Sequence, residues 1–400
     1  MADMEEKQVA DQSCGRVTCP QARQALPLDE AHLATLAEPL RPVYVYSWLK
    51  ELLHRSVVTS PPHHLSRLPT VPRGEIKEQQ QQLVEQLMCQ VKEGGCGAPA
   101  RQLLASSLAT LFSVGDTFLL FDTINKCNDL LKTRDDSPAF LPCRLAATVV
   151  VGTMYEKLGR MMGRSYEETV IVLTKGLKNA ESLTRVETMV TLAKVCRGLG
   201  GAAANVHKDI YKAARGCLAD RAMAVRVAAA ECLLEMVEQC AWLYTSPELE
   251  TLARECFRAM EGANHAARGA VARLLGQLVA STQDSGKGRA RAMFPLPPAK
   301  EKQEKGKGER SLEDALNILG QGFLRGGLGS SLLKGSTVSQ ELRVGLSHTY
   351  VAMARALGPA WLERHLHPLL THLLELAASP RTAGDHTESV LTRCCLTRDE

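Results

Sequence analysis

Six arginines recur at a near-constant interval along this 400-residue chain, and each opens a stretch with helical periodicity. The successive intervals are 43, 41, 41, 42 and 75 residues, and the last becomes one ordinary period once an insertion of about 33 residues is removed. A repeated unit of fixed length therefore builds most of the chain. The arginines of this column are Arg101, Arg144, Arg185, Arg226, Arg268 and Arg343.

The residues that follow each arginine are apolar at fixed offsets. Seven, ten and eleven positions later the side chain is aliphatic, aromatic or a thiol in every unit, as at Leu108, Leu111 and Phe112 after Arg101. These offsets share one face of an α-helix. Paired helices with a period of roughly 40 to 47 residues are typical of HEAT and armadillo arrays. The chain is predicted to be an all-α solenoid of HEAT/armadillo-like helical repeats.

Composition agrees with such an array. Apolar residues make up 45% of the chain but aromatic residues only 4%, so the packed interior must be mainly aliphatic. In a solenoid each helix pair is covered by its neighbours and there is no single central core. The net charge of +4 comes from one segment, 284–310, which holds eight Lys/Arg and four acids.

The 13 cysteines do not indicate a disulfide framework. Most of them lie within helical patterns, as Cys127, Cys196, Cys217, Cys232 and Cys256 do, and small buried thiols are expected there. The sequence has no signal peptide, no glycosylation sequon and no apolar run close to the ~20 residues that cross a bilayer. We therefore expect a reduced, cytoplasmic protein.

Composition also divides the chain. A polar, unpatterned segment 1–28 is expected to be a disordered leader, and HEAT-like repeats are expected over 29–280. The basic Gly/Pro/Lys-rich segment 281–310 is predicted to be a flexible linker loop, and the repeats continue over 311–388. Residues 389–400 begin another amphipathic stretch and stop. We expect a truncated tail, and hence a fragment or short isoform of a longer solenoid.

Serines mark several expected helix starts. Ser137 and Ser246 each precede a proline, which is suited to the first helical position because its missing N–H costs nothing there. Ser165 and Ser311 each precede an acid by three residues, which is the spacing of a capping box. We expect all four hydroxyls to cap helices.

Motifs for catalysis, cofactors and metals are weak. Gly198-Leu-Gly-Gly-Ala-Ala fits a dinucleotide fingerprint only in letters, because it follows a helical pattern and not a strand. The glycine-rich stretch that begins at Gly322 lacks the Walker spacing and is expected to form a turn. The histidines His365, His367 and His372 lack a metal-binding pattern. We expect no catalytic, cofactor or metal site, and the protein-binding residues are unknown at this stage.

Two features allow a ligand-binding interpretation. The arginine column could clamp acidic groups, but arginines at these positions of stacked repeats are more often bonded to acids or carbonyls of the adjacent repeat. The basic segment 284–310 could bind nucleic acid, although its charges alternate with acids and it carries no aromatic platform. We favour the structural interpretation of the column and a solvated loop for the basic segment.

Several motifs resemble the N-terminal part of the HEAT-repeat-containing protein 5 family. The resemblance extends from about Leu28 to about Thr387, while the leader and the segment 394–400 depart from the pattern. The motifs that carry it are Arg41-Pro-Val-Tyr-Val-Tyr-Ser-Trp-Leu, Leu83-Val-Glu-Gln-Leu, Ser113-Val-Gly-Asp-Thr-Phe, Asp122-Thr-Ile-Asn-Lys-Cys-Asn-Asp-Leu, Tyr155-Glu-Lys-Leu-Gly-Arg-Met-Met-Gly, Gly198-Leu-Gly-Gly-Ala-Ala-Ala, Asp209-Ile-Tyr-Lys, Asp220-Arg-Ala-Met-Ala-Val-Arg and Gly322-Phe-Leu-Arg-Gly-Gly.

This resemblance implies a large non-catalytic scaffold of clathrin-dependent vesicle traffic between endosomes and the trans-Golgi network. It implies aftiphilin, gamma-synergin and the first clathrin adaptor complex as partners, and peripheral membrane association through them on endosomes, the trans-Golgi network and clathrin-coated vesicles. No nucleic acid partner is expected. Two alternatives stay open: another solenoid role, as a transport receptor or phosphatase scaffold, and nucleic-acid binding through residues 284–310.

Overall fold

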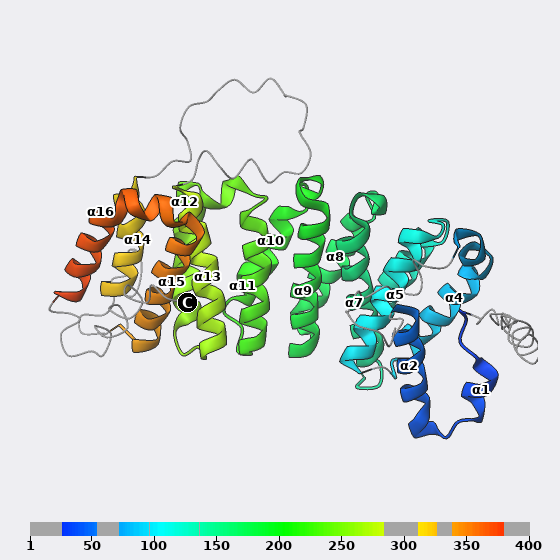
Figure 1. The fold of residues 1–400 in the computed structure, drawn as a ribbon. Helices are drawn as coiled ribbons and strands as arrows, with labels where there is room; N and C mark the ends of the chain where they lie inside the picture. Colours follow the sequence, from blue (N-terminus) through cyan, green and yellow to red (C-terminus); the bar gives the residue numbers. More distant parts are fainter. Residues whose placement is uncertain are drawn as a thin grey trace, which may run out of the picture.

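Helices alone make up the regular structure of the residues described in the computed structural model, which are 26–53, 72–95, 97–135, 137–283, 311–325 and 338–379. They follow one another in pairs along a single axis, from the blue to the red end of the ribbon in Figure 1. The predicted all-α solenoid is confirmed.

Each pair consists of a first (A) and a second (B) helix. The A helices are α4 (Arg73–Glu93), α6 (Leu120–Lys132), α8 (Tyr166–Gly176), α10 (His207–Cys217), α12 (Ser246–Met260) and α14 (Leu312–Arg325). The B helices are α5 (Ala98–Val114), α7 (Leu141–Leu158), α9 (Ser182–Leu199), α11 (Met223–Val237), α13 (His265–Ser281) and α15 (Gln340–Leu357). The flanking helices are α1 (Glu30–Thr35), α2 (Arg41–Leu53) and α16 (Pro359–Ala377).

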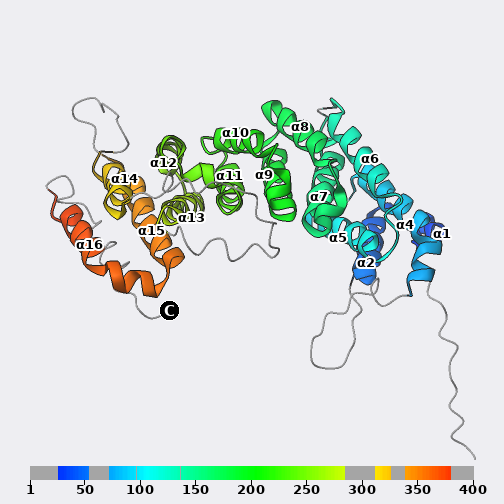
Figure 2. The same cartoon turned by 90° about the horizontal axis from the view of Figure 1, so that it is seen from above.

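The B helices form a continuous layer. From α2 through α5, α7, α9, α11 and α13 to α15, each packs against the next one in this order. Seen from above, the helices describe a shallow arch in which the A helices lie on the outer side and the B helices on the inner side (Figure 2). Contacts between consecutive B helices therefore hold the array together.

The arginine column marks the helix register. Every one of the six arginines is the fourth residue of its B helix, and its backbone N–H donates to the carbonyl of the residue just before the helix, as from Arg101 to Gly97 at 3.0 Å. The apolar positions seven, ten and eleven residues later are all buried except Ala354, which is partly exposed. The predicted stripe of buried apolar residues is confirmed. The same periodicity that forms each helix also places these residues on the face that packs in the core.

The predicted caps are correct at one of the four serines. Ser311 accepts the N–H of Asp314 at 3.1 Å and donates to its carboxylate at 2.7 Å. At Ser165 the prediction is wrong, because the hydroxyl donates to the Met162 carbonyl and contacts the Tyr155 hydroxyl instead.

The expected cap at Ser137 is also wrong, and Ser246 does not stand at the position before its helix. Helix α7 begins only at Leu141, because Pro142 takes the first turn and residues 138–140 form a separate turn. Ser246 is itself the first residue of α12, and the residue before the helix is Thr245. In both places the Ser-Pro pattern correctly indicates a helix start, but the start is misplaced by three residues at Ser137 and by one residue at Ser246.

Glycines permit close approach between helices. A Cβ on Gly198, in α9, would lie 2.0 Å from the Tyr155 carbonyl oxygen of α7, so only glycine fits there. Gly322 lies within α14, where a Cβ would meet the Phe257 ring at 2.7 Å. The expected glycine-rich turn is therefore wrong at Gly322, whose missing side chain lets α14 pack on α12, and the rest of that stretch, 326–337, lies outside the described residues.

Packing begins slightly before the expected end of the leader. Leu26 and Leu28 are buried, and the Trp48 indole N–H donates to the Leu26 carbonyl at 3.0 Å. The Gln86 amide pairs with both the N–H and the carbonyl of Leu28. The rest of the leader, most of the linker loop 281–310 and the tail 389–400 lie outside the described residues.

Five cysteines predicted to be buried are buried. Burial raises the pKa of Cys127 and Cys196 to about 12, and it also raises the pKa of Cys217, Cys232 and Cys256. These thiols stay protonated near neutral pH, and they act as small apolar side chains of the packed layer.

Candidate protein-binding surface

The arginine column secures the turns between paired helices. Guanidinium groups of four column arginines reach back to a carbonyl of the turn that precedes their own B helix. These bonds run from Arg144 to Asp135, from Arg185 to Ala180, from Arg226 to Asp220 and from Arg268 to Ala263. A turn carbonyl left unpaired by the A helix is thereby satisfied.

Two of these arginines also bridge to the next repeat. Arg185 makes a bidentate pair with Asp220, at 2.8 and 3.0 Å, and Asp220 also accepts the N–H of Ala222. Arg226 donates to the carbonyls of Ala259 and Glu261 at 3.1 and 3.3 Å. The predicted bridge between adjacent repeats is confirmed here, whereas the bonds recorded for Arg144 and Arg268 stay within their own pair.

The column is not a surface array of cations. Arg101 and Arg343 are buried, and the Arg343 guanidinium lies 5.8 Å from the centre of the Phe323 ring. Because these charges are withdrawn from solvent or bonded to backbone carbonyls, the column is unsuited to clamping a ligand along its length. The structure favours the structural role of the column.

A second set of charges lies across successive B helices and was missed in the sequence. Arg197 of α9 bonds to Glu156 of α7 at 2.5 Å and to Glu235 of α11. Lys194 of α9 donates to Thr153 of α7 at 3.1 Å. The pairing continues between α11 and α13 through Glu231 and Arg273. We call this set of side chains the inner-face ladder; it comprises Thr153, Glu156, Lys194, Arg197, Glu231, Glu235 and Arg273.

The positions of these charges within the sequence repeat could have predicted part of the inner-face ladder. Glu156 and Arg197 each stand twelve residues after a column arginine, and opposite charges at one register position of adjacent repeats predict a pair. The Glu235 carboxylate raises the pKa of Arg197 further above its usual value, so this side chain is always a cation. The sequence pattern predicts only part of the ladder, because Glu235 stands nine residues, and not twelve, after its column arginine Arg226.

The inner-face ladder can exchange partners. The Arg197 side chain is 50% exposed and the Arg273 side chain 57% exposed. Exposed ion pairs contribute only about 0–1 kcal/mol, so an incoming protein can replace them at little cost. A shallow helical face with charges of both signs is better suited to binding another protein than to binding a small molecule.

Chemistry other than binding finds little support in the described residues. His365 bonds to the Trp361 carbonyl and His372 to the Tyr350 hydroxyl, both at 2.9 Å. In the described ranges no three His, Cys, Asp or Glu side chains are grouped as metal ligands would be. Among the helices described, none has the length and apolarity that a membrane crossing requires.

Fold and surface together define a HEAT-type α-solenoid, a class typical of non-enzymatic protein-binding scaffolds. No protein-family model matches the chain. Protein SWEETIE of Arabidopsis thaliana is 30% identical to it over 216 residues, or 52% of this chain. This chain spans only 9% of the length of that relative.

One solved structure overlaps the chain weakly. It is the crystal structure of Kap121p bound to Pho4p, which superposes with a TM-score of 0.45 and 12% sequence identity. The overlap covers 91% of this chain and 36% of the solved chain. Similarity at this level carries no functional information.

Proposed function

We propose that this chain is a protein-binding scaffold of clathrin-dependent vesicle traffic between endosomes and the trans-Golgi network. Its partners would be aftiphilin, gamma-synergin and the first clathrin adaptor complex, and they would hold it on endosomal, trans-Golgi and clathrin-coated membranes. The protein itself would be cytoplasmic and non-catalytic, and it would provide a long surface on which several partners assemble.

The observation that carries the binding role is the inner-face ladder on a continuous layer of B helices. Its charged side chains are partly exposed and only weakly committed to one another. The trafficking context is supported by the motifs that resemble the HEAT-repeat-containing protein 5 family. Several of their residues hold the fold, such as Trp48, Tyr155, Gly198 and Asp220.

A direct binding experiment tests this function. The full chain is immobilised and exposed separately to purified aftiphilin with gamma-synergin, to the purified first clathrin adaptor complex, to Ran and to a protein phosphatase core. Retention of a trafficking partner supports the proposal. If Ran or the phosphatase is retained and both trafficking preparations pass through, the chain serves a different solenoid role.

Two matched variants locate the binding face. Arg273→Glu reverses an inner-face charge on α13, and Lys208→Glu makes the same change on α10, on the outer side of the arch. Arg273→Glu is expected to weaken partner retention by about tenfold, while Lys208→Glu leaves it unchanged. Equal behaviour of the two variants would remove the inner face from the proposal.

A further inference from the structure

A cavity of about 850 Å³ opens between the second and third helix pairs. The C-terminal parts of α6 and α8 and the N-terminal halves of α7 and α9 line it. It therefore lies at the edge of the solenoid where A helices end and B helices begin, and it involves none of the residues of the inner-face ladder.

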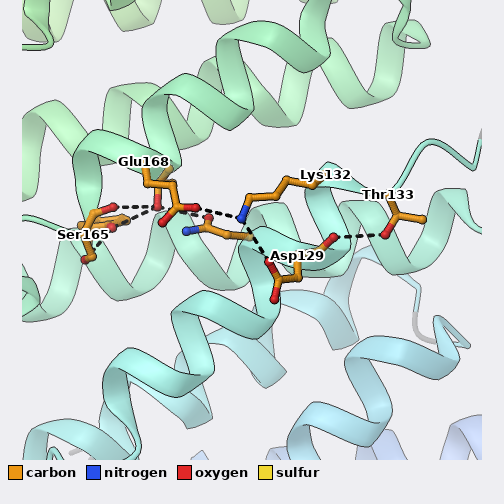
Figure 3. Close-up of polar contacts among 8 residues, drawn as sticks. Asp129, Lys132, Thr133, Ser165 and Glu168 are labelled. Carbon is orange, nitrogen blue, oxygen red and sulfur yellow. Dashed lines mark hydrogen bonds and ion pairs between the residues drawn. The ribbon is translucent and has the colours of Figure 1, made fainter.

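Cations dominate the lining of this cavity. Five Lys or Arg residues face a single acid, Glu168, and Lys132 neutralises that acid at 2.8 Å. Figure 3 shows the Lys132 ammonium between Glu168 and Asp129, the latter at 3.0 Å. The remaining cations of the lining are Arg134, Arg144, Lys175 and Lys178.

Three of these cations have no carboxylate partner within the described ranges. Arg134, Lys175 and Lys178 are exposed, and they form no ion pair with any described residue. Three like charges around one opening create a positive potential that attracts an anionic group. In this respect they differ from the cations of the inner-face ladder, which all have acidic or hydroxyl partners.

The wall of the cavity offers a buried donor. Thr184 is only 6% exposed, lines the cavity and has no hydrogen-bond partner for its hydroxyl. It stands in the first turn of α9, whose preceding residue, Glu181, provides no side-chain cap. The positive end of an 18-residue helix and an unused hydroxyl thus lie together at the cavity.

Apolar side chains complete the lining. Leu131, Val172 and Leu173 line the cavity together with Ile171, which is 46% exposed. A cavity of this volume falls in the range of ligand sites that hold several groups, so it exceeds the needs of a single small anion. Its chemistry suits an occupant that carries both oxyanions and an aliphatic group.

We propose that this cavity binds a short acidic segment of a protein partner. Carboxylate or phosphoryl oxygens of the segment face Arg134, Lys175 and Lys178, and an aliphatic side chain lies against Ile171. The Thr184 hydroxyl donates to one of the oxyanions. The inference rests on the protein-binding function proposed above, because the occupant is part of a partner protein.

A peptide fits better than a nucleic acid or a membrane. The lining holds no aromatic side chain on which a base could stack. A buried hydroxyl such as that of Thr184 is out of reach of a flat lipid surface. Aliphatic and cationic groups side by side match a chain in which acidic and aliphatic residues alternate.

Fluorescence anisotropy with the full chain tests the proposal. Three labelled peptides are compared: one alternates Glu and Leu, one carries phosphoserine in place of Glu, and one carries Gln. The Glu or the phosphoserine peptide is expected to bind at least tenfold more tightly than the Gln peptide. The stronger of the two identifies the natural oxyanion.

Matched variants assign the binding to this cavity. The double variant Lys175→Glu/Lys178→Glu is expected to bind the acidic peptide about tenfold or more weakly than the unchanged protein. The control double variant on α10, Lys208→Glu/Lys212→Glu, is expected to bind it with unchanged affinity. Thr184→Val removes the hydroxyl at nearly constant shape and is expected to weaken binding about threefold without lowering the melting temperature. This last readout separates loss of a donor from loss of fold.

Several results would overturn the inference. Equal binding of the acidic and Gln peptides would do so, as would equal losses in the two double-lysine variants. The same holds if single-stranded RNA or phosphatidylserine vesicles bind through Lys175 and Lys178 while no peptide does. Because these measurements use the isolated chain and peptides, they fail or succeed independently of whether the trafficking partners bind to the inner face.

Discussion

At the scale of single residues, the buried apolar side chains and the hydrogen-bonded arginines of the repeat contribute differently to its structure. Leu233 is fully buried between neighbouring B helices, whereas Arg226 is partly exposed and bonded to backbone carbonyls. Water can replace the arginine at those carbonyls, but nothing replaces the leucine inside the packed layer. We therefore expect the apolar stripe to provide most of the folding stability, and the arginine column to fix how adjacent repeats are aligned.

Alanine variants at these two residues test that division. Leu233→Ala is expected to destabilise the fold by about 2–5 kcal/mol, because it leaves a cavity between tightly packed helices. Arg226→Ala is expected to cost about 1–2 kcal/mol, since the carbonyls it leaves can be hydrated. Urea unfolding of both variants measures the difference. A larger loss at Arg226 would contradict the assignment.

At the scale of elements, the most extensive contact between described helices spans the long insertion in the repeat array. Helices α13 and α15 pack against each other although the insertion and α14 separate them along the chain. A Cβ on Gly276 of α13 would lie 2.6 Å from the Ala352 Cβ and 2.8 Å from the Met353 nitrogen of α15. The missing side chain at Gly276 thus lets α13 and α15 pack closely across the insertion.

Two glycines on the same helix provide a matched test of this contact. Gly276→Ala is expected to destabilise the protein by about 1–3 kcal/mol, because the new methyl group overlaps α15. Gly269→Ala, where no atom lies within 4 Å of the new methyl, is expected to be neutral or to stabilise by up to about 1 kcal/mol. Thermal melts compare the two. Similar losses at both positions would mean that α13 and α15 are not in direct contact.

At the scale of the whole molecule, one buried and two half-buried histidines make the stability of the array depend on pH. Burial lowers the pKa of His207, His348 and His372, which lie in or against different helix pairs. In the unfolded chain these groups protonate near pH 6.5, but in the folded chain they resist protonation. Protonation therefore favours the unfolded state, and the effect is spread along the solenoid.

The expected consequence is a loss of stability in mild acid. Stability should be level between about pH 7 and 8 and should fall as the pH decreases through 6.5 toward 5.5, where most carboxylates are still ionised. Urea midpoints across this range measure the trend, and His372→Gln should reduce its slope. A midpoint that is constant or that rises toward pH 5.5 would contradict this account.

The sequence by itself determined the repeat, the position of each B helix and the buried stripe. These depend on local periodicity, which places residues a fixed number of positions apart on one helix face. For the same reason the column arginines could be placed near the start of each B helix, and the five buried cysteines in the packed layer.

Only the tertiary structure decided what those residues touch. The pairing of Arg197 with Glu235, the pairing of Arg185 with Asp220, and the cavity beside Thr184 all join residues of different repeats. Their distances depend on how each helix pair is rotated and shifted against the next, through contacts such as Gly198 on Tyr155. That rotation is the sum of many small packing effects, and no single stretch of sequence encodes it.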